Sequence, residues 1–103
     1  MNQQLFGKAW HGEVTCAAAP AQVEGNADGV YFYFRNRYGA IWFGLGDTPD
    51  AAVEASEGVD DRIPGPIWLD LADYQHQLEA VAIIEKLLAP AAASLLVEEE
   101  GKP

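Results

Sequence analysis

A densely aromatic stretch between residues 30 and 45 constrains the fold more than any other part of the chain. Residues 30–36 have the sequence VYFYFRN and residues 40–45 the sequence AIWFGL, with Tyr38 and Gly39 in the connection. β-Branched and aromatic residues favour strands, and a short connection containing glycine joins strands as a hairpin. The segment 30–45 therefore predicts an antiparallel β-hairpin.

Alternation of side chains assigns the two faces of this hairpin, because successive residues of a strand point to opposite sides. The all-apolar face is expected to pack in the core and carries Val30, Phe32, Phe34, Ile41, Phe43 and Leu45. The opposite face mixes aromatic and basic residues, namely Tyr31, Tyr33, Arg35 and Trp42. The hairpin thus has one core face and one amphipathic aromatic face.

The second strong element is a helix over about residues 71–89. Asp70 or Asp73 can cap its start, and Pro90 is expected to end it. Its helically spaced apolar stripe consists of Leu78, Val81, Ala82, Ile84 and Leu88, extended by Leu71 and Tyr74. This stripe is expected to cover the apolar face of the hairpin and so to form a second layer.

The remaining segments carry weaker patterns. Residues 4–16 suggest one bent strand or two short ones, and residues 17–29 suggest a loop leading to a turn. In residues 47–57, Thr48 could cap a helix starting at Pro49, but Ala51, Val53 and Ala55 alternate, which favours a strand. Residues 58–66 predict a loop, and residues 91–103 either a short helix or a frayed tail.

Together these segments predict one α+β domain over residues 1–103. The expected architecture is a small antiparallel sheet of 3–4 strands packed by one C-terminal helix. At 103 residues, with 50% hydrophobic and 11% aromatic residues, the chain can bury a core without a metal or a disulfide. The single cysteine, Cys16, excludes an internal disulfide and favours a reducing compartment, so a cytoplasmic location is expected. Neither a signal peptide nor a membrane-spanning run of about 18 apolar residues is recognisable.

The net charge of −10 comes entirely from the second half of the chain. Residues 1–46 contain three acidic and three basic residues, whereas residues 47–103 contain 13 acidic and three basic ones. The densest acidic segment comprises Asp47, Asp50, Glu54, Glu57, Asp60 and Asp61. Such a field repels nucleic acid and acidic membranes, and it favours encounter with basic proteins. The alternative interpretation is a surface that only keeps the protein soluble.

Catalytic and metal-binding patterns are missing from the sequence. The acidic segment lacks EF-hand spacing, and GLGD at residues 44–47 lacks the third glycine of a phosphate loop. Cys16 and His11 could be imagined as a nucleophile–base pair, but an inert thiol on a strand is the better interpretation. His76 is expected on the polar face of the helix. We therefore expect no enzymatic activity, no cofactor and no metal.

What remains is a partner-binding surface. Aromatic residues next to arginine are enriched at protein-interface hot spots, and the acidic segment would attract a basic partner. The predicted partner-binding residues are Asp47, Asp50, Glu54, Glu57, Asp60, Asp61, Tyr31, Tyr33 and Trp42. A homo-oligomeric structural or accessory domain, with the aromatic face packed on a second copy, is the alternative.

In size and acidity the chain resembles the small inhibitor proteins of phages and mobile elements, including anti-CRISPR proteins and DNA mimics. The resemblance implies an inhibitor whose carboxylates imitate phosphate and occupy the basic channel of a nucleic-acid-binding complex in the host cytoplasm. No family motif accompanies the resemblance, so it assigns no functional residue.

Overall fold

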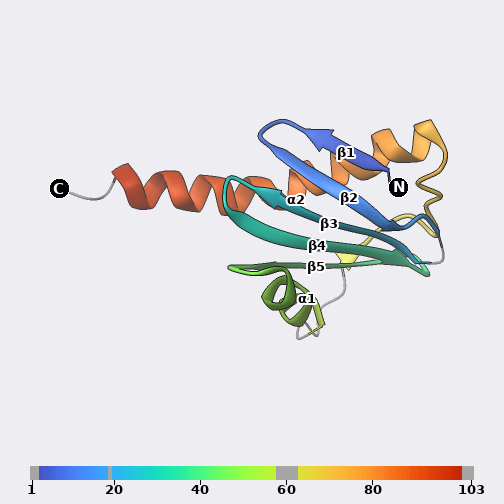
Figure 1. Ribbon diagram of the computed structural model, residues 1–103, viewed down its shortest axis with the longest axis horizontal. Coiled ribbons are helices and arrows are strands. Elements are labelled where there is room, and N and C mark those ends of the chain that lie inside the picture. Colours follow the sequence, from blue (N-terminus) through green and yellow to red (C-terminus); the bar gives the residue numbers. More distant parts are fainter. Residues whose placement is uncertain (1–2, 19, 58–62, 101–103) are drawn as a thin grey trace.

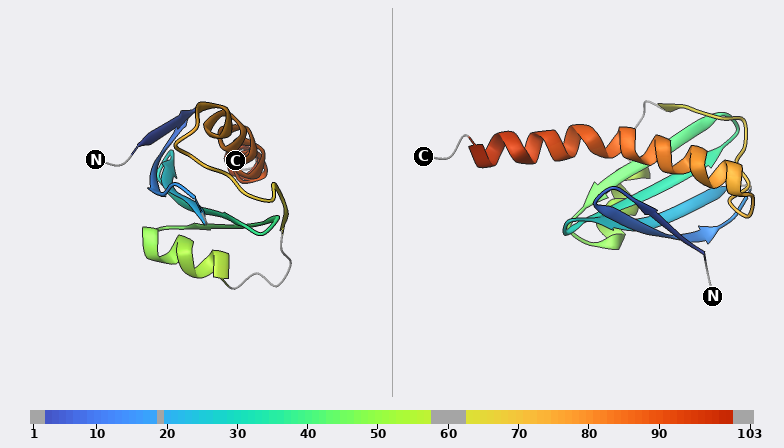
Figure 2. Two further views of the ribbon diagram at one scale, coloured as in Figure 1. Left: turned by 90° about the vertical axis from the view of Figure 1, so that its right-hand side faces the viewer. Right: turned by 90° about the horizontal axis from the view of Figure 1, so that it is seen from above.

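The computed structural model describes residues 3–18, 20–57 and 63–100, with residues 90–100 as helical backbone only. Its centre is a six-stranded sheet in which every strand pairs antiparallel with its neighbours along the chain. Two helices, α1 (Pro49–Glu57) and α2 (Tyr74–Glu100), lie on opposite faces of this sheet (Figures 1 and 2). The strands are β1 (Gln4–Gly7), β2 (Trp10–Cys16), β3 (Ala21–Ala27), β4 (Val30–Arg37), β5 (Ala40–Gly46) and β6 (Ile63–Pro64).

The hairpin predicted over residues 30–45 is confirmed as β4 and β5, with Phe34 opposite Phe43. Tyr38 and Gly39 both have positive φ, 53° and 74°, as the two-residue turns that match strand twist require. Asp28 and Gly29 repeat this geometry between β3 and β4. The predicted core face is confirmed for Phe32, Phe34, Ile41, Phe43 and Leu45, which are buried or packed against the core, whereas Val30 is half-buried and lies outside the core cluster.

The prediction of 3–4 strands and one helix is wrong, because the sheet has six strands and α1 is a second helix. The main omission is β3, whose sequence AQVEGNA was expected to form a loop. Ala, Gly and Asn are weak strand formers, but β3 is paired along its length with β2 and β4. A Cβ at position 25 would overlap the ring of Phe32, so the strand needs glycine there although glycine is a poor strand former.

The prediction that residues 47–57 form a strand is also wrong. Thr48 caps α1: its Oγ1 accepts a hydrogen bond from the Ala51 N–H at 3.1 Å, and Pro49 occupies the first helical position. The helix lies across β5 and β4, with Ala52 and Ser56 buried. A Cβ at Gly44 would overlap the Ala52 carbonyl oxygen and the Ser56 amide nitrogen. The glycines of β5 thus allow α1 to lie with its backbone against the sheet.

On the other face, α2 and the loop before it cover the core. Ala80, Ile84 and Leu88 are buried, and Leu69 and Leu71 of the loop fill the same layer. The predicted stripe was therefore placed wrongly in part: Leu78 is 48% exposed. Leu69 and Leu71 occupy space on the sheet that was assigned to the helix. The helix residues that are buried, Ala80, Ile84 and Leu88, are spaced four residues apart.

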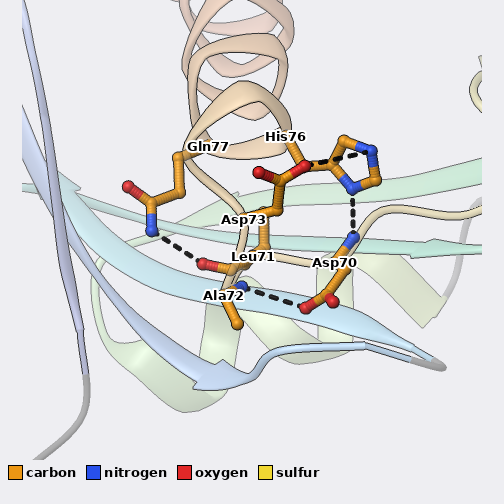
Figure 3. A network of polar contacts seen from close by, with 6 residues as sticks. All are labelled: Asp70, Leu71, Ala72, Asp73, His76 and Gln77. Atoms are coloured by element: carbon orange, nitrogen blue, oxygen red, sulfur yellow. Dashed lines mark hydrogen bonds and ion pairs between the residues drawn. The ribbon is translucent and has the colours of Figure 1, made fainter.

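A polar network fixes the start of α2 at Tyr74 rather than near residue 71 (Figure 3). The Asp70 N–H donates to His76 Nδ1 at 2.7 Å, and the Gln77 side-chain amide donates to the Leu71 carbonyl at 2.8 Å. Asp70 Oδ1 accepts from the Ala72 N–H in the turn before the helix. His76 is thus a half-buried structural residue.

The other end of α2 also differs from the prediction, because the helix continues past Pro90 to Glu100 and extends beyond the sheet (Figure 2). Proline lacks one backbone donor and disfavours a helix interior, but it did not end this helix.

Candidate binding groove on the α1 face

Two rows of side chains cross the sheet on the face that carries α1. Strand pairing aligns Gln4, Glu13, Glu24, Tyr33 and Gly44 in one row. The neighbouring row contains Phe6, His11, Asn26, Tyr31 and Gly46. Both rows end on the β5 glycines beneath α1. Because α1 packs on β5 and β4, the part of each row on β1, β2 and β3 lies beside the helix.

A groove of about 400 Å³ lies on this part of the sheet. Pro49, the first residue of α1, forms part of its edge. Its polar lining comes from four strands and consists of Gln4, His11, Glu13, Glu24, Asn26 and Tyr31. This volume is at the lower end of the range for small-ligand pockets, and it suits a side chain or a small molecule.

Glu13 and Glu24 dominate the electrostatics of the groove, because they lie directly opposite each other on β2 and β3. Glu13 is exposed and Glu24 is half-buried. Within the described residues, neither carboxylate has a lysine, arginine or histidine nitrogen within 4.0 Å. Like charges directly opposite across strands are destabilising. The groove therefore holds two carboxylates that lack a direct ion-pair partner among the described residues.

The predicted acidic residues lie partly beside this groove. Asp47 precedes α1, and Asp50, Glu54 and Glu57 belong to it; all four are exposed. The helix α1, which carries three of them, lies on the face of the sheet opposite α2 (Figure 2), and this is the face that the groove residues share. Asp60 and Asp61 lie outside the described residues. The α1 acids and the groove pair thus place six carboxylates on the side of the sheet that also carries Arg35 and Arg37.

The three predicted aromatic residues are not brought together into one exposed patch. Tyr31 lines the groove, but Tyr33 is only 9% exposed and lies opposite Gly44, in the region that α1 covers. Burial raises the pKa of the Tyr33 hydroxyl above 10.0, while Arg35 opposes the shift and Glu24 adds to it. Trp42 is half-buried, with the Arg35 guanidinium carbon 5.4 Å from its ring centroid. Tyr33 is therefore unsuited to partner contact.

Sequence reasoning missed most of the groove. His11, Glu13, Glu24 and Asn26 meet only because β2 pairs with β3, and β3 was expected to be a loop. The alternation of polar residues in HGEVT and QVEGN was the signal that could have found them.

A second exposed surface was also missed. Tyr38, Ile67 and Trp68 are 79%, 75% and 58% exposed. The Gly39 N–H donates to the Ile67 carbonyl at 3.2 Å, which holds the loop before α2 against the β4–β5 turn. The Trp68 ring packs edge-on against His76 at 5.1 Å between centroids. We call Tyr38, Ile67 and Trp68 the apolar patch.

The remaining features of the described ranges concern metal ligands, the single cysteine and the apolar length of the helices. These ranges contain no group of three or more His, Cys, Asp or Glu residues placed to hold a metal ion. Cys16 is a free thiol whose Sγ lies 3.5 Å from the Ala18 carbonyl oxygen. No helix in the described part of the chain is long and apolar enough to cross a membrane.

Comparisons with known proteins, made against family models, curated proteins and solved structures, gave no match for this chain.

Proposed function

We propose that this protein is a non-enzymatic protein-binding inhibitor or adaptor that engages a basic partner through its acidic, α1-bearing side. The observation that carries the proposal is the Glu13–Glu24 pair, two carboxylates held in a groove without a cation within 4.0 Å among the described residues. The exposed acids of α1 surround this site with further negative charge.

Two physical effects would act together in this binding. The summed negative charge attracts a basic partner over a distance and raises the rate of encounter. A desolvated contact at the groove then slows dissociation. The size and acidity that resemble phage-type inhibitors favour a nucleic-acid-binding protein in the cytoplasm as the partner, with carboxylates occupying sites that phosphates would fill.

The experiment is an affinity capture from a lysate of the source organism with a tagged protein as bait. A matched bait carries amide replacements at six acidic residues on the α1 side, namely Glu13, Glu24, Asp47, Asp50, Glu54 and Glu57. Mass spectrometry should identify basic proteins on the parent bait that are lost from the variant and at high salt. A captured set that is no more basic than the lysate, or that both baits retain equally, would refute the proposal.

The proposed function predicts that the protein does not bind nucleic acid directly. Six basic residues against 16 acidic ones leave a field that repels phosphate, so gel-shift assays with single- or double-stranded DNA should show no complex at physiological salt. A micromolar DNA complex would contradict the proposed role.

A homo-oligomeric accessory domain is the second candidate, and the apolar patch is the observation that favours it, since exposed apolar surface often marks an interface. Size-exclusion chromatography with light scattering tests it. A monomeric mass at micromolar concentration would refute the homo-oligomeric candidate and leave protein binding as the proposed function.

A further inference from the structure

We infer that the groove beside α1 receives an arginine side chain of the partner, with Glu13 and Glu24 pairing to its guanidinium. This inference rests on the proposed function and names the chemistry of its central contact. It uses the groove's shape and mixed polar lining rather than its acidity alone.

The arrangement of acceptors supports a planar cation. Residues directly opposite on antiparallel strands have Cβ atoms about 4.5–5.5 Å apart, so the two carboxylates can lie on either side of one ligand group. An ionised carboxylate only accepts hydrogen bonds, and the two groups together present four oxygens. A guanidinium carries five N–H donors in a rigid fork and can bond both carboxylates at once.

The rest of the lining suits the same ligand. The Gln4 side-chain amide oxygen and the Tyr31 hydroxyl add acceptors around the carboxylates, whereas Asn26 Oδ1 already accepts a hydrogen bond from the Gly29 N–H at 2.9 Å. Arginine also stacks on aromatic rings, and Tyr31 and His11 line the groove next to the carboxylate pair.

Other occupants fit less well. A lysine ammonium is a compact point charge with three donors, so it uses fewer of these acceptors and gains nothing from a fork geometry. A calcium ion takes six to eight oxygen ligands, whereas the described residues hold no three-ligand acidic cluster. The groove therefore favours arginine among the cations that a partner can offer.

The test uses a short peptide containing two arginines and titrates it into isotopically labelled protein while recording amide NMR spectra. Two matched peptides replace arginine by lysine or by citrulline, which keeps the shape but has no charge. For the parent protein, the arginine peptide should move the Glu24, Asn26 and Tyr31 amides, bind more tightly than the lysine peptide, and lose binding when citrulline replaces arginine.

Two protein variants separate the groove from general charge. Glu13→Gln/Glu24→Gln removes the groove pair, and Asp50→Asn/Glu54→Gln removes two charges on the exposed α1 surface. The groove variant should weaken arginine-peptide binding by roughly tenfold or more, as expected for loss of charge-assisted bonds. The α1 variant should change it by less than about threefold, through screened attraction only. Because Glu24 is half-buried, the thermal midpoints of all variants are checked first.

The outcomes distinguish this inference from the proposed function. Equal weakening by both variants, equal binding of the lysine peptide, or shifts only outside the groove would overturn the arginine site. The proposed function would still stand if the parent captured basic proteins that the six-acid variant lost. Displacement of the peptide by millimolar calcium would assign the groove to a metal ion and overturn the inference as well.

Discussion

Replacing Gly44 with alanine should lift α1 off the sheet, and the structure allows the cost to be worked out. The new Cβ would overlap the Ala52 carbonyl oxygen and the Ser56 amide nitrogen, and it would lie 3.0 Å from the Ser56 Cα. All three are backbone atoms, so no side-chain rotation relieves the overlap. Gly44 does not have positive φ, which makes the cost steric rather than conformational.

Overpacking a tightly packed site costs about 1–3 kcal/mol and occasionally more. Where the backbone permits it, replacing glycine with alanine stabilises the folded state by about 0.4–1 kcal/mol, because alanine lowers the conformational entropy of the unfolded chain. We therefore expect Gly44→Ala to lower the free energy of unfolding by about 1–3 kcal/mol. The upper part of this range is favoured, because a whole helix must move. The loss is large against the total stability of about 5–15 kcal/mol that is usual for a domain.

Urea denaturation followed by tryptophan fluorescence measures this loss, since Trp42 lies on the same strand as Gly44. Gly29→Ala is a contrasting variant: a Cβ at Gly29 meets nothing within 4 Å, so its cost comes from the positive φ of 89° and not from overlap. A double variant with Ala52→Gly should not recover stability, because the Ala52 carbonyl oxygen remains. A Gly44→Ala protein as stable as its parent would refute the packing of α1 on β5.

Four further perturbations test other parts of the structure. Ile84→Asp should abolish the cooperative thermal transition by burying a charge, whereas Leu78→Asp, at a half-exposed site, should shift the midpoint only slightly. Glu13→Gln should raise the free energy of unfolding by about 0.2–1 kcal/mol in urea titrations, because it relieves a like-charge pair. Trp68→Ala should cost less than about 1 kcal/mol yet weaken any association that involves the apolar patch in light scattering. The raised pKa of Tyr33 stabilises the fold below pH 10.0 and this contribution is lost as pH rises further; Tyr33→Phe should therefore lose less stability than its parent in urea titrations above that pH.

The elements that were predicted correctly are those whose signals are local. In residues 30–45 the strand-forming residues are contiguous and the turn residues lie between them, so each strand and their pairing follow from neighbouring sequence. The signals that predict the existence of the C-terminal helix were likewise local, but those that decide which side of the helix packs on the sheet were not. Leu69 and Leu71, which precede it, compete for the same sheet surface and decide which helix residues are buried.

The elements that were missed depend on distant partners. The residues of β3 have a low intrinsic preference for strands, and the strand forms because it pairs with β2 on one side and with β4 on the other. In residues 47–57, alternating apolar residues resembled a strand, although the Thr48–Pro49 start pointed to the helix that forms. Glycines at 44 and 46 made that helix compatible with the sheet, and their role is apparent only in three dimensions.

The candidate site shows why counting charges along the chain was insufficient. Residues 1–46 are neutral in total, but their three acidic and three basic side chains, all in the described part of the chain, form no ion pairs with one another. Arg35 and Arg37 stack on Trp42 and Tyr38, with guanidinium carbons 5.4 and 4.7 Å from the ring centroids, while the two glutamates meet in the groove. The arginines are held by aromatic rings and do not form ion pairs with these glutamates, so the segment that is neutral in total supplies to the α1 side two carboxylates without an ion-pair partner among the described residues. The register between β2 and β3 places the two glutamates opposite each other, and the composition of the chain does not reveal this pairing.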